Sequence, residues 1–414
     1  MNIEKINKCR ACHSENLIFL FSLGEQHLTG VFPAKGQPSP PKAPLELLLC
    51  SACGLVQLAH TCDPSLLYGP SYGYRSGLNR SMREHLKQTA EYLDDFLVMK
   101  PTDIVCDIGC NDGTLLSYFK VDDLVKIGID PLADKFRRYH QKGLKISSTF
   151  FSKTAFRSVS KKPARLITSL SMFYDLEDPV SFVKDIYDCL EDDGVWYFEQ
   201  SYLKLMLDTN SYDTVCHEHL EYYSFRAINS ILAKSGMKII DATLNKINGG
   251  SMSITAAKKQ SSYSQTQRAK SLILAESEAK LTDPETYKEF IERCNIHGNA
   301  LRSKLADLKD SGKNVAGYGA STKGNVLLQY LNLGASELPF ILEINDEKRS
   351  HVTPGTNIPI KLEDEVDISD VDYLVVLPWH FRNSIIEKER DFLESGGRFI
   401  FPLPSFEIYP AEST

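Results

Sequence analysis

Two stretches of the chain alternate short apolar segments with helix-like segments, and this alternation constrains the fold more than any other feature. In the first stretch the apolar segments are 103–109, 126–130, 164–170 and 194–200, with a helical pattern at 179–190. In the second they are 314–320, 340–346, 373–379 and 397–404. Strands that alternate with helices at this spacing pair in parallel. The sequence therefore predicts an α/β fold with two doubly wound sheets, the second smaller than the first.

The same pattern sets the expected domain boundaries in the 414-residue chain. We expect a small N-terminal domain at 1–70, a central domain at 71–262 and a C-terminal domain at 313–414. Between the last two, a long, charged and periodic segment predicts a helical connector at 263–312. Within the N-terminal domain, the proline-rich run 33–44 predicts a loop.

The composition, 42% hydrophobic and 24% charged, is ordinary for a soluble globular protein with a sizeable core. The net charge of −7 gives no support to nucleic acid or an anionic membrane as a partner. No apolar run approaches the ~18–20 residues of a membrane helix, and the first residues lack the apolar stretch of a signal peptide. We therefore expect a cytoplasmic protein, and either a monomer or a small homo-oligomer.

Four of the ten cysteines form two CxxC pairs near the N-terminus, Cys9 with Cys12 and Cys50 with Cys53. In a reducing compartment such pairs are typical of metal ligands rather than disulfides. Zinc favours four thiolates in a tetrahedron, and each CxxC turn directs two sulfurs at one ion. We expect a structural Zn²⁺ site, with four unrelated buried thiols as the alternative. Cys62 and His13 are alternative ligands.

A glycine-containing loop follows the first apolar strand of the central domain, with Asp107, Gly109, Asn111 and Gly113 at its key positions. Glycines there let the backbone turn sharply and approach a ligand. Asp130 ends the next strand, where a carboxylate can bind both ribose hydroxyls. The third glycine of the dinucleotide fingerprint is missing, which argues against NAD. The loop resembles that of class I methyltransferases, and a plain strand–helix turn is the alternative.

The densest run of polar groups is 211–223, which follows the strand 194–200 and contains Cys216, His217, Glu218 and His219. Ligands of open α/β sheets bind at the carboxyl edge, where this run should lie. A histidine beside a carboxylate can act as a general base, and nearby tyrosines can hydrogen-bond an enolate. The alternatives are histidines that only brace a loop and a Cys216 nucleophile. A zinc-protease HExxH motif is excluded because Glu221 stands at its second histidine.

A second glycine turn ends the first strand of the C-terminal domain at 317–320 and opens a helix at 321–325. A helix N-terminus with hydroxyls and a lysine, Lys323, suits an anion such as a diphosphate. An ordinary strand–helix turn is the alternative. Asp346 could bind a ribose or base, and His351 with the turn at 353–355 could close over it. The run 379–381 is either core or a ligand contact.

Taken together, the chain resembles the sugar C-methyltransferases that act on nucleotide-linked 4-keto-deoxyhexoses. The resemblance covers nearly the full length in three blocks. They are the two CxxC pairs with the following GLVQL; the segments 72–77, 107–113 and 216–224; and the segments 317–325 and 353–359. It implies a zinc-binding N-terminal domain, a central class I methyltransferase domain with a Rossmann-like fold, and a C-terminal Rossmann-like domain that helps hold a nucleotide-sugar.

The resemblance implies a reaction and a set of site residues. His219 would match the base that removes a proton beside the ketone, Glu218 its neighbouring carboxylate, and Tyr72 or Tyr74 an active-site tyrosine; His217, Cys216 and Tyr222 complete the candidate catalytic set. Expected contacts to the cofactor S-adenosylmethionine come from Asp107, Gly109, Asn111, Gly113, Asp130, Pro131, Ser169 and Ser171. Expected contacts to a nucleotide-sugar come from Tyr318, Ala320, Ser321, Lys323, Asn325, Asp346, His351 and Pro354.

Two departures from the family pattern concern the groups that would polarise the ketone. Many members carry tyrosine where this chain has Cys216, and histidine near the position of Tyr174. The rival functions are O- or N-methylation of a nucleotide-sugar, a nicotinamide-dependent oxidoreductase or epimerase, and a non-catalytic zinc-bearing binding protein. Binding of S-adenosylhomocysteine would argue against the last two.

Overall fold

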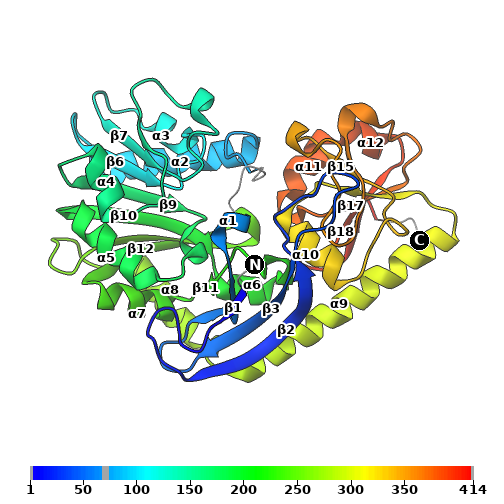
Figure 1. Cartoon of the computed structure of the whole chain (residues 1–414), viewed down its shortest axis with the longest axis horizontal. Helices are drawn as coiled ribbons and strands as arrows, with labels where there is room; N and C mark the ends of the chain where they lie inside the picture. Colours follow the sequence, from blue (N-terminus) through cyan, green and yellow to red (C-terminus); the bar gives the residue numbers. More distant parts are fainter. Residues whose placement is uncertain (1–2, 68–73, 412–414) are drawn as a thin grey trace.

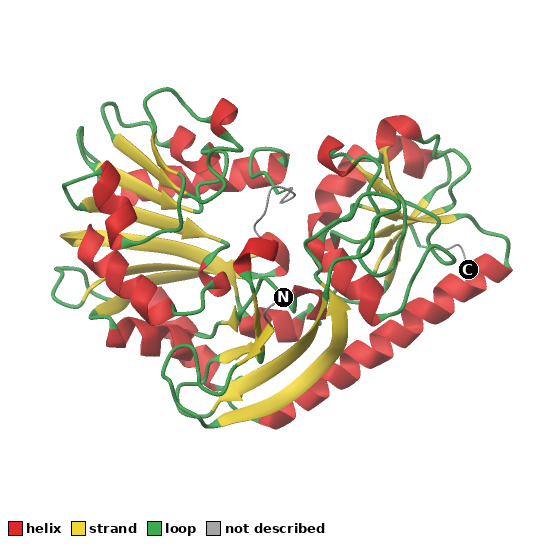
Figure 2. Ribbon diagram, in the orientation of Figure 1, coloured by secondary structure: helices red, strands yellow, loops and turns green. Residues whose placement is uncertain are grey.

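The computed structural model describes residues 3–67 and 74–411. It has two α/β lobes with a curved N-terminal sheet below and between them (Figures 1 and 2). The central lobe contains the first predicted sheet, and the C-terminal lobe contains the second. None of the helices in the described residues combines the length and the apolar character that crossing a bilayer requires.

The central lobe is built on a seven-stranded sheet with the order β12-β13-β10-β9-β6-β7-β8. The strands from β6 to β10 pair in parallel, which confirms the predicted sheet. Three further strands, β8 at one edge and β12 and β13 at the other, were not predicted, and β13 is antiparallel to both of its neighbours. The strands are β6 (Ile104–Ile108), β7 (Val125–Ile129), β8 (Lys145–Ser147), β9 (Ala164–Leu170), β10 (Leu190–Ser201), β12 (Met237–Asn245) and β13 (Ser251–Lys258).

The C-terminal lobe has a six-stranded sheet with the order β16-β15-β14-β17-β18-β19. All pairs are parallel except the last, and the four predicted strands form its centre. The two edge strands are only three residues long and were not predicted. The strands are β14 (Val315–Tyr318), β15 (Ile341–Glu343), β16 (Ile360–Leu362), β17 (Tyr373–Val376), β18 (Arg398–Phe401) and β19 (Glu407–Tyr409).

Helices cover both faces of the two sheets (Figure 2). The longest, α9, lies within the predicted connector and packs against β2 of the N-terminal sheet and β14 of the C-terminal lobe (Figure 1). It begins at an Asp283 cap followed by proline, a typical helix start. The helices are α1 (Pro64–Leu67), α2 (Arg80–Leu97), α3 (Thr114–Tyr118), α4 (Lys153–Val159), α5 (Pro179–Cys189), α6 (Leu203–Asp208), α7 (Phe225–Lys234), α8 (Gln267–Ser277), α9 (Pro284–Asp310), α10 (Thr322–Tyr330), α11 (Arg382–Lys388) and α12 (Arg390–Glu394).

The N-terminal sheet includes a strand from the central lobe. Its order is β11-β4-β3-β2, and a separate short pair joins β1 to β5. The strands are β1 (Ile3–Lys5), β2 (Leu17–His27), β3 (Lys42–Cys50), β4 (Val56–Leu58), β5 (His60–Cys62) and β11 (Glu221–Tyr222). Strand β11 pairs antiparallel with β4, and the Leu58 amide donates to the Leu220 carbonyl over 2.9 Å. The segment just after the Cys-His-Glu-His run is therefore part of this sheet.

The four cysteines of the two CxxC pairs gather at one end of the N-terminal sheet. Their sulfur atoms all lie within 4.8 Å of one another, with 3.6 Å between Cys9 and Cys53 and 3.4 Å between Cys12 and Cys50. Four thiolates at the Zn–S distance of about 2.3 Å would be about 3.8 Å apart in a tetrahedron. The donor set thus fits zinc, and the alternative ligands Cys62 and His13 lie outside this group.

Arg10, between the first two cysteines, ties the zinc cluster to strand β4. Its backbone amide donates to Gln57 Oε1 over 3.0 Å, and its guanidinium donates to the Leu58 carbonyl over 2.6 Å. Because β4 pairs directly with β11, the metal cluster supports the strand that follows His219.

Zinc removal tests this support. Chelation of the metal should lower hydrogen-exchange protection of the backbone amides in β4 and β11 by about 10-fold or more. The two CxxC pairs that anchor β4 would no longer be joined through the metal ion. Protection of β6, in the core of the central sheet, serves as the internal control and should change less than about 2-fold. Mass-spectrometric exchange with equal protection in β11 before and after chelation would contradict the coupling.

Candidate active site

The predicted cofactor loop lies between β6 and α3 and needs unusual backbone angles. Gly109, Asn111 and Gly113 have φ values of 72°, 50° and 75°, in the left-handed region that glycine and asparagine tolerate best. Asp107, at the end of β6, accepts a hydrogen bond from Thr168 Oγ1 over 2.7 Å. Burial raises the pKa of this carboxyl to about 7. The loop therefore curls over the carboxyl edge of the sheet, where a cofactor can approach its backbone.

Asp130 lies at the tip of the neighbouring strand β7, as predicted. Its carboxylate accepts the backbone amides of Asn111 over 2.9 Å and Leu132 over 2.6 Å. Each carboxylate oxygen has a further lone pair, so both hydroxyls of a ribose could still bind. Pro131 follows directly and is half-buried. The carboxylate thus fixes the loop and faces the same edge as a cofactor would.

A segment before α2 lies over the cofactor loop. The amide of Ser76 donates to Asn111 Oδ1 over 3.0 Å, and Asn111 Nδ2 donates to the Tyr74 carbonyl over 3.1 Å. The amide of Gly77 donates to Asp112 Oδ2 over 2.9 Å. Tyr74 is therefore adjacent to the loop, as a residue contributed from before the sheet should be. The candidate Tyr72 lies outside the described residues.

The two serines expected at the cofactor differ in their surroundings. Ser169 is fully buried, and its hydroxyl accepts the indole N–H of Trp196 over 2.9 Å, so its side chain serves the core of the lobe. Ser171 has a φ of 54° and lies at a cavity wall, where its hydroxyl accepts Asn248 Nδ2 over 3.1 Å. Only Ser171 presents its side chain to the site.

The cavity that contains His219, which we call the main cavity, has a volume of about 350 Å³ and is lined by all three parts of the molecule. The central lobe supplies Cys216, Glu218 and His219, the N-terminal part supplies a loop after β2, and the C-terminal lobe supplies the start of α10. The lining includes Gly30, Phe32, Tyr74, Arg75, Ser171, Tyr174, Cys216, Glu218, His219, Asn248, Ala320, Ser321, Lys323, Lys348, His380 and Phe381.

His219 is held in this cavity with one ring nitrogen available. Its Nδ1 lies 2.9 Å from the Thr214 carbonyl, which can only accept, so Nδ1 carries the hydrogen and Nε2 the lone pair. The ring packs on Tyr174 with 4.2 Å between centroids. Burial and the nearby Lys323 lower the pKa of His219 to about 3. The imidazole is therefore neutral at physiological pH, with an unprotonated Nε2.

Glu218 also faces the main cavity, against the backbone of the N-terminal part. The Cys216 thiol donates a hydrogen bond to it, and burial raises the pKa of Glu218 to about 7. A β-carbon at Gly30 would lie only 1.8 Å from Glu218 Oε1, so this position needs glycine. Burial raises the pKa of the Cys216 thiol well above its usual value, which argues against a thiolate nucleophile.

Two members of the candidate catalytic set lie elsewhere. His217 is 2% exposed and its Nε2 donates to the Ala43 carbonyl of β3 over 3.1 Å, so it faces the N-terminal sheet. It does not line the main cavity, and the expectation that it contacts substrate is not supported. Tyr222, in β11, lines a void of only about 10 Å³ that it shares with Tyr174 and His219. Tyr222 thus borders His219 without reaching the main cavity.

A second cavity of about 910 Å³ adjoins the main one at the C-terminal lobe. Ala320 and Ser321 line both cavities, and Ser321 Oγ caps α10 by accepting the Gly324 amide over 3.0 Å. Tyr318 lines the second cavity, with its hydroxyl donating to Glu389 Oε1 over 2.8 Å. The cations Arg80 and Lys388 also line this cavity, but carboxylates outnumber them, and several apolar side chains complete the wall. The acidic and apolar residues are Glu84, Leu342, Glu343, Ile344, Glu363, Phe381, Ile385 and Glu387.

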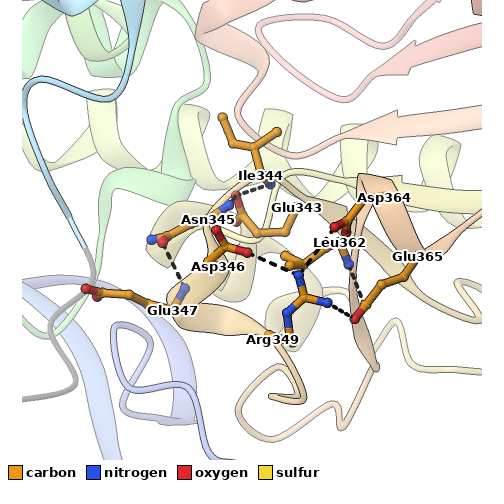
Figure 3. Close-up of polar contacts among 9 residues, drawn as sticks. All are labelled: Glu343, Ile344, Asn345, Asp346, Glu347, Arg349, Leu362, Asp364 and Glu365. Carbon is orange, nitrogen blue, oxygen red and sulfur yellow. Dashed lines mark hydrogen bonds and ion pairs between the residues drawn. The ribbon is translucent and has the colours of Figure 1, made fainter.

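The other four residues expected at the nucleotide-sugar line neither cavity. Asn325 is 1% exposed and donates to the Thr29 carbonyl over 2.7 Å, which joins α10 to the loop after β2. Asp346 is exposed and pairs with Arg349, which also binds Asp364 and Glu365 (Figure 3).

His351 and Pro354 belong to a turn that packs on the N-terminal part. His351 forms a bridge with Ala34, and the amide of Gly355 donates to Ser39 Oγ over 3.0 Å. The turn therefore holds the proline-rich loop rather than closing over a ligand.

Sequence reasoning missed several cavity residues. Glu343, rather than Asp346, occupies the tip of β15, the position that Asp130 occupies after β7. It accepts the amides of Ile344 and Asn345 (Figure 3) and the ammonium of Lys348 over 3.1 Å. An acidic residue at the end of the second strand of this lobe was the right signal. The strand was predicted to end at residue 346, three residues later than it does, so Asp346 was chosen instead of Glu343. Arg75 lies in the segment 72–77 and His380 in the run 379–381, but neither was named as a site residue.

Comparison with protein families divides the chain into three matched segments. Residues 9–68 match the family described as "Putative zinc binding domain", residues 74–242 match the methyltransferase domain, and residues 246–404 match the C-methyltransferase C-terminal domain. The C-terminal match begins before β13, so it includes the antiparallel strand of the central sheet as well as the C-terminal lobe.

Among characterised proteins, the chain is 27% identical to the C-methyltransferase NovU of Streptomyces niveus, over 100% of this chain and 99% of the relative. Solved structures align with less than half of the chain. Magnesium protoporphyrin IX methyltransferase from Synechocystis with bound S-adenosylmethionine is 12% identical, covering 46% of this chain and 88% of its own, with a TM-score of 0.33. A methyltransferase from Clostridium acetobutylicum is 11% identical, covering 42% and 92%, with a TM-score of 0.32.

The domain matches, the full-length relative and the geometry of the cofactor loop agree. The chain is an S-adenosylmethionine-dependent methyltransferase with an N-terminal zinc-binding domain, homologous along its whole length to the C-methyltransferase NovU.

Proposed function

We propose that this protein methylates a carbon atom of a nucleotide-linked 4-keto-deoxysugar, next to the ketone. The observation that carries this proposal is His219, a neutral imidazole with its Nε2 lone pair free, in a cavity that also borders Ser171 at the cofactor edge. A carbon beside a ketone is nucleophilic only after it loses a proton, so such a base is what carbon methylation requires.

The charges around the two cavities support a nucleotide-sugar as substrate. Arg75, Lys348 and the N-terminus of α10 border the main cavity and would attract a diphosphate. The adjoining cavity is lined by carboxylates such as Glu343 and by apolar groups such as Ile344. Carboxylates in such a wall suit ribose hydroxyls, and its apolar groups suit a base. The keto-sugar would then extend from the diphosphate toward His219.

In the reaction, His219 Nε2 takes the proton from the carbon beside the ketone. Glu218, ionised above pH about 7, stabilises the resulting imidazolium through the low-dielectric cavity. Tyr174 keeps the imidazole in place through ring packing, and the Thr214 carbonyl holds its tautomer. Bound S-adenosylmethionine supplies an electrophilic methyl group. The loop residues Gly109 and Asp130 would position it at the carboxyl edge of the sheet.

Replacement of the base tests the proposal. His219→Asn should lower methyl transfer about 100- to 10,000-fold, the usual contribution of a general base. Binding of S-adenosylhomocysteine, measured by calorimetry, should remain within about 3-fold, because the cofactor loop is built from other residues. His217→Asn is the matched control and should retain turnover, since His217 faces the N-terminal sheet. Near-normal turnover by His219→Asn would show that His219 is not the general base.

The pH dependence tests the role of Glu218. Burial raises the pKa of Glu218 to about 7, so the carboxylate becomes protonated as the pH falls below that value and cannot stabilise the imidazolium. We expect log kcat/KM to fall by about one per pH unit below pH about 7. His219, with its pKa lowered to about 3, stays neutral over this range.

Glu218→Gln should therefore remove this acidic limb and lower the plateau. Asp107 also has its pKa raised to about 7, so S-adenosylhomocysteine binding must be measured over the same pH range as a control. An acidic limb that persists unchanged in Glu218→Gln would assign the titration to another group.

A further inference from the structure

We propose that Lys323 is a catalytic residue whose ammonium hydrogen-bonds the ketone oxygen of the substrate and stabilises the enolate. This inference rests on the proposed function and deepens it, because it names the group that polarises the carbonyl. The sequence pattern had suggested a diphosphate contact for Lys323. The structure places the ammonium at the reacting end of the main cavity instead.

The ammonium reaches from the C-terminal lobe into the central lobe. Lys323 is on the first turn of α10, and its Nζ donates to the Asn248 carbonyl over 2.6 Å. Asn248 lies between β12 and β13, and its own side chain donates to Ser171 Oγ over 3.1 Å. Ser171 follows β9 at the cofactor edge of the sheet. The ammonium is thus anchored beside the place where the methyl donor and the base meet.

Lys323 lies close enough to His219 to affect its protonation. Its positive charge lowers the pKa of both His219 and His380, two other residues of the main cavity. Burial lowers the pKa of Lys323, and the Asp213 carboxylate opposes this by favouring the ammonium. Asp213 is fixed by the Trp379 indole, which donates to it over 2.8 Å. The cluster therefore keeps a positive charge close to His219.

The Lys323 ammonium has N–H groups available for a further acceptor. It carries three hydrogens, and the Asn248 carbonyl accepts one of them. The Cys216 thiol is a weak donor that is already engaged with Glu218. A charged donor stabilises a developing oxyanion more strongly than a neutral one, above all in a cavity that excludes water. Lys323 is thus suited to hold the carbonyl oxygen while its lone pairs gain charge.

The chemical step balances with these groups alone. The C–H bond beside the ketone breaks, and its proton goes to His219 Nε2. The electron pair forms a carbon–carbon double bond while the carbonyl π pair moves to the oxygen, which Lys323 stabilises. When this carbon attacks the sulfonium methyl, a C–C bond forms, the C–S bond breaks with its electrons going to sulfur, and the ketone is restored. His219 then returns its proton to solvent.

The test separates enolisation from binding. The probes are thymidine, uridine and guanosine diphosphate-linked 4-keto-6-deoxyhexoses, incubated in deuterium oxide without the methyl donor. Mass spectrometry follows deuterium uptake beside the ketone. Lys323→Met should lower the exchange rate at saturating substrate by about 100-fold or more, the usual cost of an oxyanion donor. Its KM and its affinity for the free nucleoside diphosphate should change less than about 3-fold.

Two further variants serve as a control and as a contrast for Lys323→Met. Lys361→Met, at the exposed position of edge strand β16 and outside both cavities, controls for the loss of a lysine in the same lobe and should behave as wild type. Lys348→Met should instead raise KM and weaken binding of the free nucleoside diphosphate. Zinc content and S-adenosylhomocysteine binding of Lys323→Met, together with partial rescue by added methylammonium, distinguish a chemical defect from misfolding.

The outcomes are distinct. A Lys323→Met variant that exchanges deuterium at the wild-type saturating rate, with a raised KM, would overturn the enolate role and return Lys323 to the diphosphate. A folded variant with slow exchange that methylammonium accelerates would support it. Absence of exchange in the wild-type protein with all three probes would overturn the proposed function itself, and the enolate role with it.

Discussion

The pairing of β4 with β11 is the interaction on which the active site depends. Strand β11 begins two residues after His219, and its backbone hydrogen bonds to β4 fix the register of the segment that carries the base. On the other side, Arg10 and the cysteine cluster anchor β4. The cysteine cluster, distant in sequence, is therefore linked through β4 to the segment that carries His219.

The main cavity exists only because three parts of the chain contribute to it. The N-terminal part supplies Gly30, where any side chain would collide with Glu218. The central lobe supplies His219 beside the cofactor edge, and the C-terminal lobe supplies Lys323 through the start of α10. Residues of both charge signs line each cavity, with Arg75, Lys323 and Lys348 in the main one and four glutamates in the adjoining one.

Local sequence patterns predicted the features that local geometry determines. The cofactor loop with Asp130, the CxxC cluster and the four central strands of each lobe all follow from short motifs and apolar periodicity. The predictions failed where distant contacts decide. His217 and His219 are two residues apart, yet only the pairing with the N-terminal sheet turns one away from the cavity. Asn325 suited an anion site by sequence, but Thr29, almost three hundred residues earlier, binds its side chain.

The central claim is that the methyl group is transferred to carbon. Carbon-13 NMR of the product formed with S-adenosylmethionine labelled in its methyl group tests this directly. The account predicts a one-bond coupling between the labelled methyl carbon and a ring carbon next to the ketone. A labelled methyl group bonded to oxygen or nitrogen would contradict it.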